Sequence, residues 1–326
     1  MRILITGGAG FIGSHLAERL LSLGHEIVCL DNFNDFYDPT LKRRNIVKAL
    51  SHHCYTLVKG DILDRELLDK VMGDNFEAVV HLAAYAGVRP SIERPDIYQR
   101  VNVEGTLNLL ERCRLNSIPR FIFASSSSVY GGRTEVPFRE TDDVMQPISP
   151  YAATKVAGEA LCYTYHHLFS LNVHCLRFFT VYGPRQRPEM AIHLFAAQMM
   201  RNEALPVFGD GTSARDYTYI SDIVRGVVAS IERCRGFAVI NLGGSSATSL
   251  NELIARLAAR LKKKPILNRR PSQPGDVPIT FADVTRAKEL LGYAPQVGIE
   301  EGIDRFCAWF EKQHAVGDGC QEQEIK

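Results

Sequence analysis

Residues 6–16 read Thr6-Gly7-Gly8-Ala9-Gly10-Phe11-Ile12-Gly13-Ser14-His15-Leu16 and lie between a β-branched run and an apolar helical pattern. Gly8, Gly10 and Gly13 fit the spacing G-x-G-x-x-G, and Gly7, Gly10 and Gly13 fit the wider G-x-x-G-x-x-G. A tight turn and the close approach of backbone N–H groups to a pyrophosphate both need residues without a β-carbon. Because these glycines stand where a strand would pass into a helix, they predict a dinucleotide-binding loop.

The sequence after this loop predicts an α/β fold. Up to about residue 180, short β-branched runs alternate with helical patterns, as in a parallel sheet covered by helices. We expect strands at Arg2–Thr6, Ile27–Leu30, Tyr55–Lys59, Ala78–Leu82, Phe121–Ser125 and Val173–Arg177, and helices near 11–23, 64–72, 93–116 and 150–170. The predicted fold is a Rossmann-type doubly wound parallel sheet, in which ligands bind beyond the carboxyl ends of the strands.

Residues at the ends of further strands complete the predicted cofactor site. Asp31 ends the second strand, where a carboxylate accepts hydrogen bonds from ribose hydroxyls and repels a 2′-phosphate, so NAD is favoured over NADP. A turn role for Asp31, in the pair with Asn32, would also fit. We expect Asp61 and Ile62 beside the adenine, and, beside the pyrophosphate and ribose, the stretch Leu82-Ala83-Ala84.

The regular alternation of strand-like and helix-like segments ends after Gly183-Pro184. We expect helices near 192–201, 220–232, 249–261, 284–291 and 299–313, strands at 205–208 and 238–242, and a Pro-rich loop over 265–278. The predicted organisation is an NAD-binding Rossmann domain over residues 1–180, to which 216–242 return. A smaller C-terminal α/β substrate-binding domain covers 181–314, and a frayed tail covers 315–326.

Composition excludes several classes of protein. The 326 residues are 45% hydrophobic and 23% charged with a net charge of +1, so neither nucleic acid nor a membrane surface is expected as a partner. No apolar run approaches membrane-spanning length, and no signal peptide precedes the first strand. Eight cysteines without a Cys-x-x-Cys pair favour a reducing cytoplasm. The pairs His52-His53 and His166-His167 lack ligand partners at metal spacing, so no metal site is expected.

Tyr151 and Lys155 stand at positions i and i+4 of a predicted helix, and so project from one face. A nearby ammonium stabilises a phenolate, which allows the phenol to act as an acid or base near neutral pH. Tyr and Lys also meet at this spacing in many exposed helices, so the pair needs further support.

Four motifs together resemble the extended short-chain dehydrogenase/reductases, the NAD-dependent epimerase/dehydratase family. They are the glycine run, His81-Leu82-Ala83-Ala84 with Asn102, Ser125-Ser126-Ser127-Ser128-Val129-Tyr130-Gly131, and Tyr151-x-x-x-Lys155. The resemblance runs from Met1 to about Gln313 and is strongest to the UDP-glucuronate 4-epimerases. Residues 31–38, 86–92 and 177–191 carry that subgroup resemblance, although Pro90 stands where those enzymes often have an aromatic residue.

The resemblance implies a catalytic set for epimerisation at C4 of a UDP-sugar. Tyr151 would take the proton of the sugar 4-hydroxyl, Lys155 would hold the phenolate and the nicotinamide ribose, and Ser126 would hydrogen-bond the reacting oxygen. Ser126 would also fit as a strand-end serine that satisfies backbone groups. Asn102 and Phe178 are expected in the cofactor site, Asn102 as a support for its hydrogen bonds.

A uronic substrate adds a demand, because a ketone at C4 makes the C6 carboxylate prone to leave as carbon dioxide. The groups best placed to hold the carboxylate are Thr180 and Arg187, with Ser127 opposite, since a guanidinium pairs well with a carboxylate. Arg185 and Arg89 compete for this role, and either arginine of the 185–187 segment could pair with a protein acid instead. At the UDP end the resemblance implies Met190, Pro206, Phe208, Arg215, Gln273 and Asp276, although Asp276 would also fit a loop turn.

Ser127 and Ser128 disfavour two related reactions. The 4,6-dehydratases carry an Asp-Glu pair at these positions, and the related decarboxylases usually carry Glu at the position of Ser128. The expected reaction is therefore conversion of UDP-glucuronate to UDP-galacturonate. The alternatives are a UDP-glucose or UDP-N-acetylglucosamine 4-epimerase, and a non-catalytic NAD-binding sensor. The family also implies a homodimer that packs the helices near 93–116 and 150–170 into a four-helix bundle.

Overall fold

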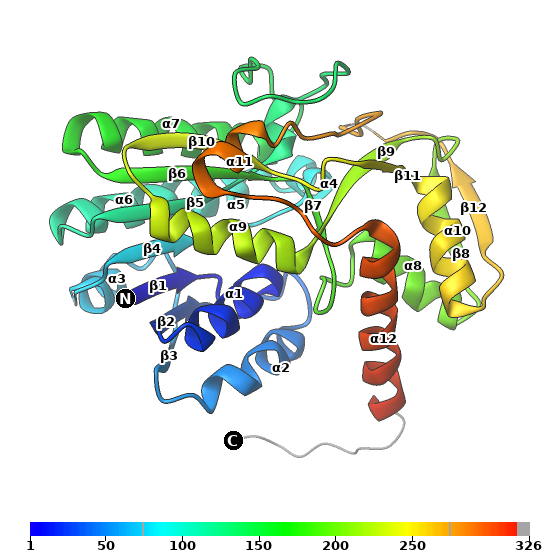
Figure 1. The fold of residues 1–326 in the computed structure, drawn as a ribbon, viewed down its shortest axis with the longest axis horizontal. Coiled ribbons are helices and arrows are strands. Elements are labelled where there is room, and N and C mark those ends of the chain that lie inside the picture. Colours follow the sequence, from blue (N-terminus) through cyan, green and yellow to red (C-terminus); the bar gives the residue numbers. More distant parts are fainter. Residues whose placement is uncertain (74, 274, 318–326) are drawn as a thin grey trace.

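The computed structural model of the chain describes residues 1–73, 75–273 and 275–317. Its centre is a seven-stranded parallel sheet with the order β10-β6-β5-β4-β1-β2-β3 (Figure 1). The strands are β1 (Arg2–Thr6), β2 (Glu26–Asp31), β3 (Tyr55–Lys59), β4 (Ala78–His81), β5 (Arg120–Ser126), β6 (Asn172–Phe178) and β10 (Phe237–Leu242). The order reverses between β1 and β4, which is the point where doubly wound sheets bind ligands. The predicted fold class is confirmed.

Helices cover both faces of this sheet. One face carries α1 (Phe11–Ser22), α2 (Pro39–Leu50) and α9 (Ile220–Arg233), and the other carries α3 (Arg65–Met72), α6 (Gly105–Leu115) and α7 (Pro150–Phe169). Alternate residues of β1 enter the two cores: Ile3 and Ile5 pack with α1 and α9, whereas Leu4 packs with α3 and α6. A strand buried on both faces reads as a continuous apolar run, which is why these strands could be predicted.

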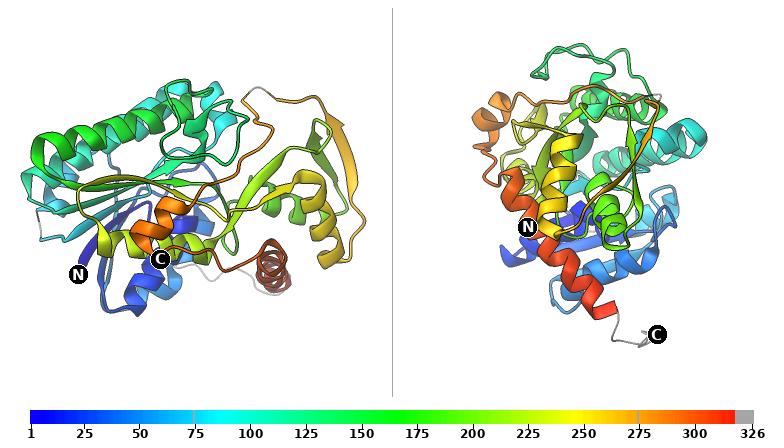
Figure 2. Two further views of the ribbon diagram at one scale, coloured as in Figure 1. Left: turned by 45° about the horizontal axis from the view of Figure 1, so that its top comes forward. Right: turned by 90° about the vertical axis from the view of Figure 1, so that its right-hand side faces the viewer.

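A second lobe lies beyond the carboxyl ends of the strands (Figure 2). It contains two small sheets, β11-β9-β7 and β12-β8, built from β7 (Thr180–Tyr182), β8 (Ala204–Phe208), β9 (Ala214–Tyr219), β11 (Ala247–Ser249) and β12 (Ile266–Arg270). Its helices include α8 (Ala191–Met200), α10 (Leu250–Leu261) and α12 (Ile299–Gly317). The short α11 (Thr285–Leu291) contacts α9 and β10 of the main sheet. The chain thus crosses to the second lobe after β6, returns to the main sheet with α9 and β10, and crosses again with β11 and α10.

Three predicted elements differ from the structure. Residues 93–116 do not form one helix but α4 (Val88–Glu93), α5 (Pro95–Tyr98), the π-helical η1 (Gln99–Glu104) and α6, because Pro95 cannot continue a helix from Arg94. The predicted loop over 265–278 includes β12, which pairs with β8. Residues 315–317 of the predicted frayed tail belong to α12, and 318–326 lie outside the described residues. No helix in the described part of the chain is long and apolar enough to cross a membrane.

Candidate active site

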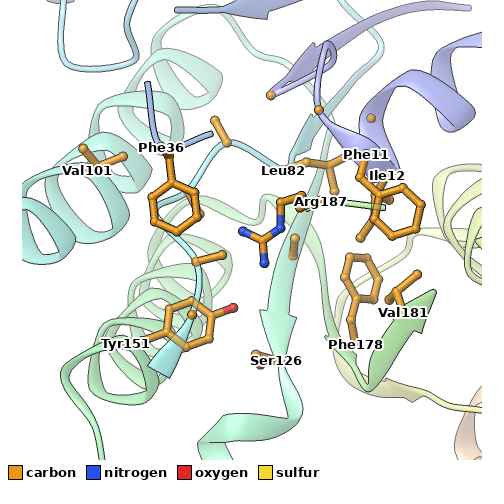
Figure 3. Close-up of a pocket in the computed structure, with 18 of the residues that line it drawn as sticks. Phe11, Ile12, Phe36, Leu82, Val101, Ser126, Tyr151, Phe178, Val181 and Arg187 are labelled. Atoms are coloured by element: carbon orange, nitrogen blue, oxygen red, sulfur yellow. The ribbon is translucent and has the colours of Figure 1, made fainter. Parts of the chain in front are cut away.

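A large cavity opens at the carboxyl ends of β1, β2, β4 and β5 and reaches the second lobe (Figure 3). Most residues predicted for the cofactor line it: Gly7, Gly10, Phe11, Ile12, Gly13, Asp31, Asn32, Asp61, Ile62, Leu82, Ala83, Ala84, Tyr151, Lys155 and Phe178. Residues predicted for catalysis and for the sugar line the same cavity: Ser126, Ser127, Thr180, Arg187 and Met190. The fold therefore brings both sets together.

The glycine loop is shaped for the close approach of another backbone. Gly7 has a φ of 70°, and a β-carbon there would lie 2.7 Å from the backbone nitrogen of Ala83. Gly10 is the N-cap of α1 and offers no side chain to its first N–H groups. Phe11, Ile12 and Gly13 of this first turn line the cavity, and a helix N-terminus at a cavity is the arrangement that binds a phosphate.

Asp31 lines the cavity and takes the turn role that was weighed as its alternative. One carboxylate oxygen accepts from the backbone N–H of Ala9 at 3.1 Å, and the other accepts from Phe33 N–H at 2.9 Å in a local turn. Each oxygen of a carboxylate has a further lone pair, so these bonds fix its orientation without using its full acceptor capacity. Asn32 is fixed as well, since its amide donates to Asp61 at 2.8 Å.

Tyr151, Ser126 and Lys155 meet at the end of β5. The Lys155 ammonium donates to the carbonyl of Ala124 at 2.7 Å and lies 5.8 Å from the centroid of the Tyr151 ring. Tyr151 turns its hydroxyl into the cavity, on the side of Ser126 (Figure 3). A phenol, a hydroxyl and an ammonium are thus available at one point for proton transfer.

The charges of this group differ from the expectation that Lys155 activates the phenol. Burial raises the pKa of Tyr151 above its usual value, and a hydrogen bond with the Ser126 hydroxyl and the charge of Arg187 oppose that rise. Burial also lowers the pKa of Lys155 to about 8, against the effects of Cys162 and Glu159. Desolvation therefore works against the phenolate, and a further positive charge in the cavity would favour it.

Glu159 and Arg177 form a buried ion pair behind this group. The Arg177 guanidinium donates to both oxygens of Glu159, at 2.9 and 2.8 Å, and the Ser125 hydroxyl donates to the same carboxylate at 2.5 Å. Glu159 lies one turn after Lys155 on α7, and Ser125 precedes Ser126 on β5. The pair therefore fixes α7 against β6, and the Ser125 bond fixes it against β5, the strand that carries Ser126.

Asn102 lies behind the cavity wall. Its amide exchanges hydrogen bonds with both backbone groups of Tyr85, at 2.9 Å each, and donates to Thr154 at 3.1 Å. Thr154 stands between Tyr151 and Lys155 on α7, so Asn102 supports the position of that helix rather than taking part in chemistry.

Arg187 extends its guanidinium into the middle of the cavity, beside Phe36 and on the side of the Tyr151 hydroxyl (Figure 3). Its carbon Cζ lies 5.5 Å from the centroid of the Phe36 ring, and its Nε lies 3.2 Å from the carboxylate of Glu189. The expected alternative, a pair with a protein acid, is therefore present. The Glu189 side chain is 43% exposed, so this ion pair contributes little free energy. A better buried anion in the cavity can therefore replace Glu189 as the partner of Arg187.

The other two arginines weighed for the sugar carboxylate lie elsewhere. Arg185 turns away from the cavity and pairs with Glu18 of α1 at 2.6 Å. Arg89 pairs with Asp276 at 2.8 Å and stacks on Phe208 at 4.2 Å, across the gap between the lobes.

A second, smaller cavity shares Val88, Ser127, Ser128 and Thr180 with the first. Of the residues predicted for the UDP end, Met190 lines the first cavity, and Pro206, Phe208 and Gln273 line neither. Arg215 and Asp276 line the second cavity. Gln273 accepts from the N–H of Asp276 through its backbone carbonyl at 3.2 Å, while Pro206 and Phe208 belong to β8. Pro274 lies outside the described residues. The two cavities together form a path from the glycine loop to the second lobe.

The cavity residues that were not assigned a role from the sequence include Asn34, Phe36, Tyr37 and Lys42. Lys42 donates to the backbone and side chain of Asn34, at 3.0 and 2.8 Å, and lies 5.0 Å from the Tyr37 ring. The 31–38 stretch was noted only for its resemblance. Lys42 comes from α2, a helix that was not predicted because few of its residues are apolar.

His52, His53 and Cys54 are the one group of three potential metal ligands in the described part of the chain, with ligand atoms within 4.8 Å of one another. Nδ1 of His52 already accepts the N–H of Cys54 at 3.2 Å, so that nitrogen would have to lose a hydrogen bond to bind an ion.

Comparisons with known proteins agree with this geometry. The model of the NAD dependent epimerase/dehydratase family matches residues 3–243. A UDP-glucuronate 4-epimerase of Thermodesulfobacterium geofontis is 42% identical over 311 residues, which cover 94% of this chain and 95% of that protein. UDP-glucuronate 4-epimerase 4 of Arabidopsis thaliana is also 42% identical, over 94% of this chain and 75% of its own. The crystal structure of UDP-glucuronic acid 4-epimerase from Bacillus cereus in complex with UDP-glucuronic acid and NAD has a TM-score of 0.89 and 38% identity, over 96% of this chain and 100% of that one.

Proposed function

The chain belongs to the NAD dependent epimerase/dehydratase family, and we propose that it interconverts UDP-glucuronate and UDP-galacturonate by epimerisation at C4, with NAD as its cofactor. The observation that carries this proposal is the cavity itself. Tyr151 and Ser126, which suit oxidation of a sugar hydroxyl, share it with the guanidinium of Arg187, which suits a carboxylate. The similar enzymes from Thermodesulfobacterium geofontis and Bacillus cereus support the same choice of sugar.

The residues around the glycine loop fit a bound NAD. The uncapped N-terminus of α1 would hold the pyrophosphate, Asp31 the adenine ribose, and Lys155 the nicotinamide ribose. Phe178, which lines the cavity, would border the nicotinamide end, and Asn102 would support the site from behind Tyr85 and Thr154. When bound, NAD supplies the acceptor for the C4 hydride, and the positive charge on its ring favours the phenolate.

Tyr151 would then act as the base. It takes the proton of the 4-hydroxyl as the C4–H bond breaks, and returns it after the 4-keto sugar has turned over in the cavity. Ser126 donates a hydrogen bond to the reacting oxygen in both directions. Burial raises the pKa of Tyr151, and the Ser126 hydrogen bond and the Arg187 charge lower it, so the same cavity groups that bind the sugar also favour the phenolate.

Arg187, Thr180 and Ser127 would hold the C6 carboxylate. In the 4-keto sugar this carboxylate is β to a carbonyl and leaves readily when the C5–C6 bond aligns with the carbonyl π system. A guanidinium that grips both carboxylate oxygens keeps the bond out of that alignment. The uronate therefore needs orientation as well as binding.

The diphosphate and the nucleoside would occupy the second cavity. Arg215 would pair with the diphosphate and Asp276 would accept from the ribose, while Pro206, Phe208 and Met190 would border the uracil. Gln273 would contact the diphosphate through a neutral amide rather than through a cationic side chain. Arg89 bridges Asp276 and Phe208, so it must shift or share these partners when the nucleotide enters.

We further propose a homodimer formed through α6 and α7. Ala153, Ala160 and Leu168 are exposed along one face of α7, and Leu107 is exposed on the neighbouring α6. Leu168 is 61% exposed, so a bundle with the same helices of a second copy would bury apolar surface. Sedimentation should give a dimer for the wild type and a monomer for Leu168→Glu; a monomeric wild type contradicts the proposal.

We propose a cytoplasmic location from the state of the cysteines. The seven described cysteines are all free, and six of them are buried. Free buried thiols are typical of proteins from reducing compartments. Fractionation of the source cells, with detection of the protein in the cytoplasmic or another fraction, tests this point.

The experiment that tests the function is incubation of the NAD-loaded protein with UDP-glucuronate, followed by proton NMR. We expect UDP-galacturonate. UDP-pentose as the main product would indicate a decarboxylase. Turnover of UDP-glucose but not of UDP-glucuronate would indicate the neutral-sugar epimerase, and no change in any UDP-sugar would favour an NAD-binding sensor.

A further inference from the structure

The turn that carries Arg187 is tied to helix α1, far away in the sequence. His15 and Glu18 lie one helical turn apart on α1, on the same face. Nε2 of His15 lies 2.9 Å from the carbonyl oxygen of Pro184, and Glu18 pairs with Arg185 at 2.6 Å. A carbonyl only accepts, so Nε2 of His15 carries the hydrogen. Burial lowers the pKa of His15 to about 4, and the ring is neutral at pH 7.

The same turn is fixed on its other side by Gln186. Its side chain is buried and donates to the carbonyl of Val181 at 3.1 Å, and its own carbonyl accepts from His193 at 2.5 Å. Every residue from Pro184 to Gln186 therefore has a specific partner in the surrounding structure.

Backbone geometry separates the two arginines of this turn. In an extended chain, residues two apart point to the same side. Arg185 instead has a φ of 65°, in the left-handed region that a residue with a side chain rarely adopts. The chain reverses there, so Arg185 faces α1 while Arg187 enters the cavity. The contacts from α1 hold Arg185 in this unfavourable conformation.

We propose that His15, Glu18 and Arg185 are positioning residues for Arg187, and that they set how completely the enzyme suppresses loss of the sugar carboxylate. This inference rests on the proposed function. None of the three needs to touch the sugar. Their role is to keep the guanidinium within the narrow range of positions in which it holds the C5–C6 bond away from the carbonyl π system.

The chemical consequence of a displaced Arg187 is specific. In the 4-keto intermediate the C5–C6 bond breaks, carbon dioxide leaves, and the electron pair of the bond passes to the C4–C5 enolate. That enolate takes a proton at C5 and becomes a 4-keto pentose. General damage to the enzyme lowers both products together, whereas a misplaced carboxylate raises the pentose relative to galacturonate.

Glu18→Ala removes the ion pair and keeps a good helix former in α1. We expect the ratio of UDP-pentose, as the ketone or its reduced form, to UDP-galacturonate to rise about tenfold, together with KM for UDP-glucuronate. Asp69→Ala is the matched control, because Asp69 forms an inter-helix ion pair with Arg112 at 2.9 Å and belongs to neither the turn nor the cavity. Its product ratio should equal that of the wild type.

Two further variants separate the ion pair from the fold of the turn. Arg185→Asn loses the pair but tolerates the left-handed backbone, and should raise the pentose ratio as Glu18→Ala does. The charge exchange Glu18→Arg with Arg185→Glu should restore a low ratio. A wild type that makes UDP-galacturonate, with unchanged ratios in Glu18→Ala and Arg185→Asn, overturns this inference alone. A wild type that leaves UDP-glucuronate unchanged overturns the proposed function, and this inference with it.

Discussion

At the scale of single residues, Tyr151 has the clearest assigned task, because its hydroxyl is the proposed proton acceptor. Tyr151→Phe removes that oxygen and leaves the ring that packs 6.2 Å from Tyr98. We expect kcat to fall by about 10²–10⁴, the usual contribution of a general acid or base. Binding of UDP-glucuronate, measured by calorimetry, should change little. Turnover within a factor of a few of the wild type would remove Tyr151 from this role.

Arg187 is the residue that we expect to discriminate between the uronate and neutral sugars. Arg187→Ala should raise KM for UDP-glucuronate by about 10²-fold or more, because a charge-assisted bidentate contact is lost. Any turnover of UDP-glucose should fall far less, since that sugar has no carboxylate. Arg187→Lys keeps the charge without the planar fork and should recover only part of the loss. Steady-state kinetics on both sugars measures this, and equal losses would contradict the carboxylate role.

The sequence indicated which types of residue form the site. It was less able to decide between neighbouring residues of the same type. Tyr151, Lys155 and Ser126 stood in motifs, so their convergence in one cavity followed from the predicted fold. Arg187 was preferred over Arg185 for the sugar carboxylate, but the sequence could not exclude Arg185, because the directions of the two side chains depend on one left-handed residue. Phe36, Tyr37 and Lys42 were missed because a loop and an unpredicted helix bring them to the cavity.

At the scale of elements, the Glu159–Arg177 pair joins α7 to β6 behind the active site. Arg177→Met would leave Glu159 buried without its cation, which costs about 3–5 kcal/mol of the free energy of unfolding. Urea denaturation at pH 7 measures the loss. Adding Glu159→Gln should recover much of it, and Arg201→Ala, which breaks the exposed pair with Glu203, should cost less than about 1 kcal/mol. A loss for Arg177→Met as small as for Arg201→Ala would contradict the buried role.

The buried elements could be predicted from the sequence more accurately than the exposed ones. The strands of the main sheet are mostly buried and rich in apolar residues, and they were found nearly to the residue. β12 is exposed along its whole length, so nothing in its composition distinguishes it from a loop. The break before α5 had a signal in Pro95, which helical periodicity on both sides of it obscured.

At the scale of the whole molecule, buried neutral histidines make stability depend on pH. Burial lowers the pKa of His174, which contacts Ser230 at 2.9 Å, from 6.5 to about 4. Below pH 6.5 the unfolded chain therefore binds a proton at His174 that the native state does not bind. As a result, the free energy of unfolding falls as the pH drops toward 4. Burial raises the pKa of Asp216 to about 6, which opposes this trend in part.

From pH 7 to pH 5, His174 alone should lower the free energy of unfolding by about 2 kcal/mol. Urea denaturation at both pH values tests this, with His174→Asn as the comparison. The difference between the two pH values should shrink by that amount in the variant. An unchanged difference would show that His174 titrates alike in the folded and unfolded states.

The central claim, that C4 is oxidised and reduced again within one cavity, is tested most directly by deuterium at C4 of UDP-glucuronate. The NAD-loaded protein is given the labelled sugar in ordinary water, and the UDP-galacturonate formed is examined by NMR and mass spectrometry. We predict that the product retains deuterium at C4, because the hydride that leaves is the hydride that returns while Tyr151 exchanges only the hydroxyl proton. UDP-galacturonate that carries solvent hydrogen at C4 would contradict the account.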